Sequence, residues 1–289
     1  MEELLARGYA STSLRVGDLS WMSRDHSHRE LSLDMRLWED STGQLIGWAY
    51  FRANGEFNVF VSSDSGHAED AALFDSLLAF IDECARAAIA AGDPPVTLVT
   101  YAIDPDRSAA DRTQAAALER AGYAVDDASN TSGVLVRSLD ELPTPELPAG
   151  YHFAWVSNPA LLTGRVEAHR GAFAPSDLSD KRYQRLQRSW AYRPTLDRLV
   201  VTDAGEVVSF CTAWYDERNA AGLLEPVGTH PIYQQRGLAR AVCLDACRAL
   251  RDLGADAAQV GFGSAAGRAT YTSAGFRQEN QELTYSKVL

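Results

Sequence analysis

The sequence predicts an α/β protein built from two domains in tandem. The second half alternates strand and helix patterns, the first half repeats that order more faintly, and a proline-rich acidic segment at residues 139–150 separates them. At 289 residues, with 46% hydrophobic and 23% charged residues, the chain suits two domains of about 100–200 residues each. We therefore expect a first domain at 1–138, a linker at 139–150 and a second domain at 151–289.

The second domain has the clearer periodicity. Asp203-Ala204-Gly205 fits a hairpin turn, and Gly254 is a plausible C-cap for a helix that begins near Leu238. The order of elements is typical of an α/β layer structure. In chain order we expect a strand at 151–156, helices near 158–173 and 179–189, strands at 197–202, 206–216 and 221–229, the helix that ends at Gly254, a strand at 257–262, a helix that carries Tyr271, and a strand at 281–288.

The first domain repeats this order. Asn54-Gly55 is a strong hairpin signal, and Gly122-Tyr123 resembles the corner formed by Gly275-Phe276 in the second half. These features predict a diverged copy of one fold. The expected elements are strands at 31–38, 44–51, 56–63 and 96–103 and a helix at 68–91, and residues 115–121 lead into the corner at Gly122-Tyr123.

Composition excludes several classes of function. The formal net charge of −12 argues against nucleic-acid binding, because phosphate contacts need clustered Lys and Arg. No apolar run approaches the ~18 residues of a membrane span. The start, Met1 to Arg7, lacks the features of a signal peptide, so we expect a cytoplasmic protein. The four cysteines are too few for a disulfide framework, and no metal is expected, because Cys243 and Cys247 lack partner ligands and suit a core.

The most informative stretch is the loop Gln234–Ala239. It lies between a strand that ends before Pro231 and a long helical pattern. A strand, a tight loop and a helix start bring free backbone N–H groups to one point, which binds phosphate with the help of the helix dipole. Gly237 leaves room for a phosphate to approach the backbone.

Two motifs in this half are similar to those of the GCN5-related N-acetyltransferases (GNAT). Gln234, Gly237 and Ala239 fit the pyrophosphate-binding signature of that family. Tyr271 and the corner Gly275-Phe276 resemble its Tyr-x-x-x-Gly-Phe motif. The resemblance covers roughly residues 151–289. It implies tandem GNAT-like domains, each with a mixed, mostly antiparallel sheet flanked by helices, in an architecture similar to that of mycothiol synthase, with a degenerate first copy.

The resemblance implies acetyl-CoA as co-substrate and a primary amine of a small molecule as acceptor, attacked directly without a metal. By position, the amide that would bind the thioester carbonyl belongs to Val227. Arg236 is ranked above Arg240 for phosphate contacts, and a solvated helix face is the alternative for both. Ser264 stands where the family usually has Asn. The implied cofactor-binding residues are Val227, Gly228, Thr229, Gln234, Gln235, Arg236, Gly237, Leu238, Ala239, Arg240 and Ser264.

Three residues are candidates for proton transfer. Tyr271 is where the family commonly places its general acid, and a phenol with a pKa of about 10 can protonate a departing sulfur; otherwise it anchors the core. Glu225 precedes the carbonyl-binding point and is either a base acting through water or an ion-pair partner. His230 titrates near neutrality and is either a base or part of the turn before Pro231. Glu225 is ranked slightly above His230.

The first copy lacks the phosphate loop. At the corresponding place, Asp64, Glu69 and Asp70 lie near a helix start, where carboxylates repel a pyrophosphate. We therefore expect no cofactor there. The first domain then either shapes the substrate pocket or a dimer, or is a structural appendage. A homodimer is compatible with the sequence, but no pattern indicates one.

The acceptor site is expected around the loop 169–177, which lines that site in the family. Two other classes of function stay open: a noncatalytic acyl-CoA-binding or sensing module, which has no need of a phenol at the sulfur, and a protein N-acetyltransferase. O-acyl transfer is a further variant. The groups that suit a cationic amine with an apolar body, or else belong to the core, are Phe173, Asp177, Trp190, Tyr192, Trp214 and Tyr215.

Overall fold

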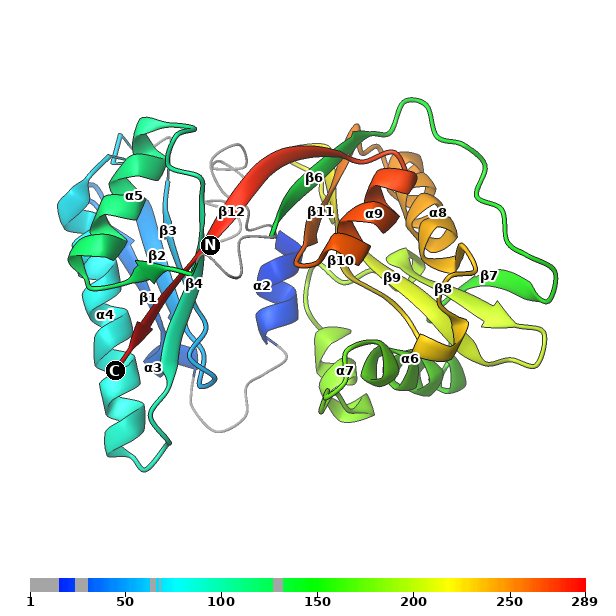
Figure 1. The fold of residues 1–289 in the computed structure, drawn as a ribbon, viewed down its shortest axis with the longest axis horizontal. Helices are drawn as coiled ribbons and strands as arrows, with labels where there is room; N and C mark the ends of the chain where they lie inside the picture. The colour runs from blue at the N-terminus through cyan, green and yellow to red at the C-terminus, as the bar shows by residue number, and fades with distance from the viewer. Residues whose placement is uncertain (1–15, 24–30, 63–65, 68, 127–131) are drawn as a thin grey trace. The chain divides into compact units, whose positions relative to one another are not determined.

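The structure is a computed structural model that describes residues 16–23, 31–62, 66–67, 69–126 and 132–289. Two compact units divide the chain. Most described residues up to Ser132, together with Asn280–Leu289, form the first unit, whereas helix α2 and Gly133–Glu279 form the second. Figure 1 shows the elements of both units.

The second unit is built on a mixed, mostly antiparallel sheet. Its strands lie in the order β6-β11-β10-β9-β8-β7, and only the pair β10–β11 is parallel. The strands are β6 (Gly133–Ser138), β7 (Tyr151–Trp155), β8 (Asp197–Thr202), β9 (Val207–Asp216), β10 (Ala221–Thr229) and β11 (Ala257–Phe262). The helices are α2 (Val16–Ser23), α6 (Pro159–Ala172), α7 (Asp180–Leu186), α8 (Leu238–Asp252) and α9 (Ala265–Ser273), with short 3₁₀ turns η4 (Pro194–Leu196) and η5 (Pro231–Tyr233).

Helices cover both faces of this sheet (Figure 1). Strand β9 shows why, because it is buried along almost its whole length and alternate side chains point to opposite faces. Phe210 and Trp214 pack with α6 and α7, whereas Cys211 and Ala213 pack with α8. All four cysteines are buried and free, which agrees with the expected core role of Cys243 and Cys247.

The first unit repeats the order of strands and helices. Strands β1, β2 and β3 form an antiparallel sheet, and β4 pairs antiparallel with β12. Apolar side chains of α4 and α5 pack on these strands in one core. The elements are α3 (Leu31–Asp34), β1 (Met35–Glu39), β2 (Leu45–Phe51), β3 (Phe57–Val61), α4 (Ala71–Ala90), β4 (Thr97–Ile103), α5 (Ala109–Arg120), β5 (Ala124–Val125) and β12 (Arg277–Val288).

Two strands are exchanged between the halves of the chain. β6 precedes the proline-rich segment, yet all its residues pair with β11. β12 follows α9, yet Glu282–Val288 pair with β4 of the first unit. The compact units therefore differ from the predicted division at residues 139–150 in these two strands, and also in helix α2, which precedes residue 139 but belongs to the second unit. Within that segment Leu139 is fully buried, so its side chain packs in the core and is not exposed to solvent.

The predicted elements of the second half agree with the structure to within a few residues. In the first half, the strand predicted at 31–38 was partly wrong, because residues 31–34 form helix α3 before β1 begins. Residues 115–120, which lead toward the Gly122 corner, belong to helix α5, and this helix begins at Ala109, since Ser108 caps it by accepting a hydrogen bond from the amide of Asp111. Helix α2 and strand β6 had no counterpart in the prediction.

The described residues contain neither a helix suited to cross a membrane nor a cluster suited to bind a metal ion. None of the described helices combines the length and apolar character that a membrane crossing requires. Across the same residues, no group of three or more His, Cys, Asp or Glu side chains is arranged to hold a metal ion.

Candidate active site

The site begins where the central sheet of the second unit opens. Strands β10 and β11 pair only from Ala221 to Leu223, and beyond that point β10 continues without this partner. The register with β9 shifts between Leu224 and Val227, which marks a bulge. Pro226 has no N–H, so the backbone amides that follow the bulge, from Val227 onward, are the donors on this stretch of the strand.

The loop after β10 has an unusual backbone. Gln235 has φ of 60° and Gly237 has φ of 79°, so both adopt left-handed conformations. A non-glycine residue in this region costs about 1–2 kcal/mol, so such positions cluster at functional sites. Left-handed and right-handed residues in succession turn consecutive amides to one side, which makes an anion-binding concavity. The Gln234 side chain fixes the loop to the strand, because its Nε2 donates to the Thr229 carbonyl at 3.2 Å.

Helix α8 begins directly after this loop. Its N-cap is Gly237, and no side chain caps the helix. No other heavy atom lies within 4 Å of the place where a Cβ of Gly237 would be. The first amides of an α-helix lack partners within the helix, and the positive end of its dipole lies here. The loop and helix start therefore offer an open site for a phosphate group, as expected.

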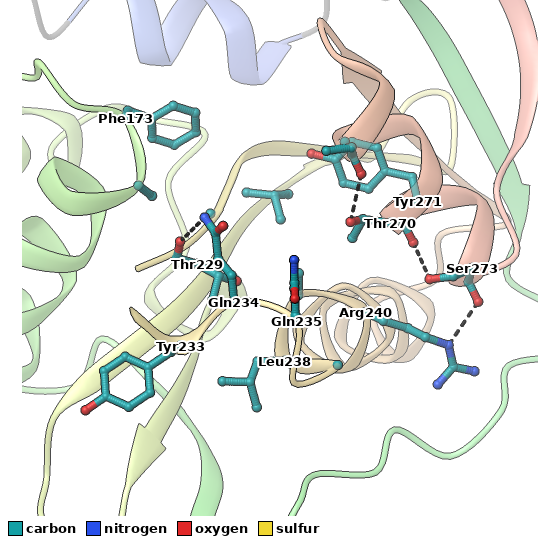
Figure 2. Close-up of a pocket in the computed structure, with 17 residues that line it drawn as sticks. Phe173, Thr229, Tyr233, Gln234, Gln235, Leu238, Arg240, Thr270, Tyr271 and Ser273 are labelled. Atoms are coloured by element: carbon teal, nitrogen blue, oxygen red, sulfur yellow. Dashed lines mark hydrogen bonds between the residues drawn. The ribbon is translucent and has the colours of Figure 1, made fainter. Parts of the chain in front are cut away.

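A cavity of about 470 Å³ connects the opened sheet with this helix start. Figure 2 shows Gln235 and Leu238 at one end, with Phe173 and Tyr271 on facing walls at the other. The volume lies within the usual range of about 300–1,000 Å³ for ligand sites. The lining residues are Ala172, Phe173, Val227, Gly228, Thr229, Tyr233, Gln234, Gln235, Gly237, Leu238, Ala239, Arg240, Ala266, Gly267, Thr270, Tyr271 and Ser273.

Tyr271 is the titratable phenol at the far end of the cavity. It extends from α9, is 9% exposed, and packs edge to face on Phe276. Burial raises the pKa of Tyr271 well above its usual value of 10, and the charges of Cys243 and Glu225 add to the increase. The phenol is therefore protonated at neutral pH and available as a proton donor.

Residues 164–276 match the acetyltransferase (GNAT) family. This match supports acyl transfer by the second unit and contains both the loop and Tyr271. No significant match is found among curated protein sequences.

Solved structures share the fold over nearly the whole chain. A GCN5-related N-acetyltransferase from Sphaerobacter thermophilus is 20% identical with a TM-score of 0.70, over 99% of this chain and 91% of that one. A tandem GNAT protein from the clavulanic acid biosynthesis pathway is 13% identical with a TM-score of 0.61, over 94% and 93%. A GCN5-related N-acetyltransferase from Kribbella flavida is 15% identical with a TM-score of 0.57, over 96% of each chain. The chain thus shares the GNAT fold with these structures.

The two candidate bases of the GNAT region lie outside the cavity lining. Glu225 is half-buried at the bulge, and its charge acts on Tyr271. The ring of His230 packs against α6, because a Cβ on Gly171 would fall 2.3 Å from its Cδ2. The Nδ1 of His230 is buried without a hydrogen-bond partner. This placement favours Glu225 over His230 as the group near the phenol.

The two arginines differ in a way that the sequence did not reveal. Arg236 donates to the hydroxyl of Tyr151 at 2.8 Å and to the Ile232 carbonyl at 3.0 Å, and it does not line the cavity. Arg240 lines the cavity while its Nε donates to the Ser273 carbonyl at 2.9 Å. Arg240 therefore lies at the cavity wall, whereas Arg236 is held outside it.

Ser264 has a structural task at the start of α9. Its Oγ accepts a 3.1 Å hydrogen bond from the amide of Gly267, as an N-cap does. Ser264 does not line the cavity, whereas Gly267 does. All the predicted cofactor-binding residues except Arg236 and Ser264 line the cavity.

The groups expected at the acceptor site are dispersed. Phe173 lines the cavity, whereas Asp177 pairs with Arg182 at 2.5 Å and Trp190 is 58% exposed. The hydroxyl of Tyr192 donates to buried Asp197 at 2.8 Å, inside a network that also holds Arg165. Tyr215 lies under the guanidinium of Arg193, and Trp214 lies in the core.

Several residues that line the cavity were not predicted from the sequence. Tyr233 lies in the η5 turn, whereas Ala266, Thr270 and Ser273 share the exposed side of α9 with Gly267. A helical projection of α9 places positions three and four apart on one side, so this spacing could have identified them.

Proposed function

We propose that the chain transfers an acetyl group from acetyl-CoA to a primary amine of a small molecule by direct attack. One observation carries the proposal: a single cavity joins an uncapped helix start to a buried, protonated phenol. The first feature suits a pyrophosphate, and the second suits a sulfur leaving group.

The residues present fit acetyl-CoA. The amides after Gln235 and the open space at Gly237 suit the pyrophosphate, and Arg240 at the cavity wall supplies positive charge. The gap between β10 and β11 would take the extended pantetheine arm alongside Val227 and Gly228. The amide of Val227 then lies where it donates to the thioester carbonyl and stabilises the developing negative charge.

The transfer requires two proton movements. The neutral amine attacks the thioester carbonyl carbon, the new C–N bond forms and the C–S bond breaks. The amine nitrogen gives its proton to Glu225, directly or through a water, and the departing sulfur takes the phenolic proton of Tyr271. The products are an amide and coenzyme A with a free thiol, so atoms and charges balance once solvent restores both groups.

A calorimetric titration with acetyl-CoA, followed by measurement of thiol release with a panel of amines, tests the proposal. We expect about one equivalent to bind, and release of coenzyme A that depends on the amine. Binding without release with any amine would favour an acyl-CoA-sensing module. Absence of binding would overturn the proposal, and two equivalents would show that the first unit binds acetyl-CoA as well.

A protein acceptor is the second reading of the same chemistry. Acetylation of a denatured-protein or peptide mixture, with no acetylation of small amines, would favour it. We prefer a small amine because the aromatic rings of Phe173 and Tyr271 line the reactive end of the cavity and suit a compact apolar body.

A further inference from the structure

Helix α2 is distant in sequence from the residues of the cavity but belongs to the same unit. It packs against β9, β10 and α7, and Figure 1 places it beside them. Figure 2 shows the blue helix beyond the end of the cavity where Phe173 and Tyr271 face one another. The question is what this helix does there.

The backbone of α2 rests on the indole ring of Trp214. A Cβ on Gly17 would fall 2.2 Å from Cγ of Trp214, so any larger residue forces the two apart. Nε1 of Trp214 donates a 2.5 Å hydrogen bond to the carbonyl oxygen of Glu225. This first chain of contacts connects α2 to the bulge that carries the candidate base.

A second chain of contacts connects α2 to the cavity wall. The ring of Trp21 lies 5.5 Å from that of His169, which lies 4.8 Å from Phe173. His169 is 6% exposed, and its Nδ1 is 3.3 Å from Oγ of Ser176, so its ring is held from two sides. Phe173 lines the cavity and is 44% exposed. Trp21 thus supports the ring that forms this wall.

We propose that α2 closes the acceptor end of the cavity and makes it selective for a small amine with an aromatic or apolar body. This inference rests on the proposed function. The exposed ring of Phe173 offers a face for such a body. The charge of Glu225, which lies outside the lining but acts on Tyr271 at this end, attracts the ammonium group. Gly17 and Trp21 act through Trp214 and His169, so both are positioning residues.

The first test is Trp21→Ala, with 2-phenylethylamine titrated calorimetrically into the full-length protein saturated with coenzyme A. Loss of the indole leaves His169 and Phe173 free to rotate, so we expect binding to weaken about tenfold, while the Kd for acetyl-CoA stays the same. Trp21→Phe keeps a ring on His169 and should restore most of the affinity. Trp155→Ala removes a half-exposed indole from β7 of the same unit and should change neither affinity.

The second test is Gly17→Ala. The added methyl group pushes α2 away from Trp214, so we expect KM for 2-phenylethylamine to rise with little change in kcat. The same methyl group in Gly261→Ala meets no atom within 4 Å and serves as the matched control. Methylamine, which has no body to stack, should show no change in KM in any variant.

The outcomes separate the two proposals. Weaker binding of 2-phenylethylamine in both α2 variants, at unchanged acetyl-CoA affinity, supports the inference. No binding of 2-phenylethylamine to the wild type, or equal binding in all variants, overturns it and leaves acetyl transfer intact if acetyl-CoA still binds and reacts with other amines. Failure of acetyl-CoA to bind at all overturns the proposed function.

Discussion

Helices α5 and α9 end in the same way in the two units. In the first, the amides of Ala121, Gly122 and Tyr123 donate to the carbonyls of Ala117, Glu119 and Leu118. In the second, those of Ala274, Gly275 and Phe276 donate to the carbonyls of Thr270, Thr272 and Tyr271. The glycines have φ of 86° and 87°. The position of the phenol Tyr271 is therefore taken by Leu118, a fully buried core residue.

The starts of helices α4 and α8, unlike the ends of α5 and α9, differ between the two units. The carboxylate of Asp70 caps α4, since it accepts hydrogen bonds from the amides of Ala72 and Leu73 at 3.0 and 3.1 Å. Helix α8 has Gly237 at its cap and no side chain there. An anion is thus built into the first helix start, whereas the second is open to one. Asp64, also expected to repel phosphate, lies outside the described residues.

The comparison teaches that backbone and chemistry are separable in this chain. Both units keep the glycine turns and helix ends that the fold needs. Only the second keeps an open helix start and a phenol. Four predictions follow, ordered from the largest expected effect.

Replacing Tyr271 by Phe would remove the phenol that distinguishes the end of α9 from the end of α5. We expect kcat to fall by about 10²-fold, because the sulfur loses its proton donor while the ring still packs on Phe276. The Kd for acetyl-CoA should stay the same. Steady-state rates together with calorimetry check this, and Tyr233→Phe is the control, since that phenol lies near the loop instead. A fully active Tyr271→Phe would assign the phenol to the core.

Replacing Gly237 by Glu would make the start of α8 resemble that of α4. A carboxylate beside the helix start repels pyrophosphate, so we expect Kd for acetyl-CoA to rise at least about tenfold. Gly205→Glu adds the same charge at a turn glycine with φ of 87° and equally open surroundings, and it should bind normally. Equal affinities for both variants would contradict the phosphate assignment.

The pH dependence of turnover tests the role of the Tyr271 phenol. Burial raises the pKa of Tyr271 above 10, and the protonated phenol is the active form, so the raised pKa extends activity to higher pH. We expect kcat to show no loss from this group up to pH about 10. A decline in kcat below that pH that disappears in Tyr271→Phe would mean that the phenol is less buried in solution.

Replacing Asp70 by Ala gives the smallest effect. Loss of the cap should lower the free energy of unfolding by about 1 kcal/mol, measured by urea denaturation. The stoichiometry of acetyl-CoA should stay at one, because the first unit still lacks the Gln-x-x-Gly loop and the phenol. Asp93→Ala, an exposed carboxylate beyond the end of α4, is the control. Binding of a second equivalent of acetyl-CoA would show that Asp70 alone had blocked a second binding site.

Local signals predicted most of the second unit. Proline, glycine and periodic apolar residues act within one element, so the sequence placed β10, the loop and α8 correctly. Gln234, Gly237 and Tyr271 were selected from local patterns for the same reason, and all three line the cavity. The first unit was harder, because Leu31–Asp34 alternate apolar and polar residues and are short enough to suit a strand or a helix turn.

Long-range pairing could not be read from local patterns. Nothing in Val16–Ser23 indicates that α2 packs on Trp214, and nothing in β6 indicates β11 as its partner. Nor does local spacing indicate that Tyr151, which is distant in sequence, holds Arg236 away from the cavity that Arg240 lines. Such partners depend on tertiary structure rather than on spacing.

The exchange of β6 and β12 also has a consequence for the maturation of the chain on the ribosome. β6 is made before the other strands of the second unit and is ready when β11 emerges. β4 is made early too, but its partner β12 follows α9, so the edge of β4 stays unpaired until then. Unpaired strand edges invite aggregation during synthesis. The unit that is translated first is therefore the last to be completed.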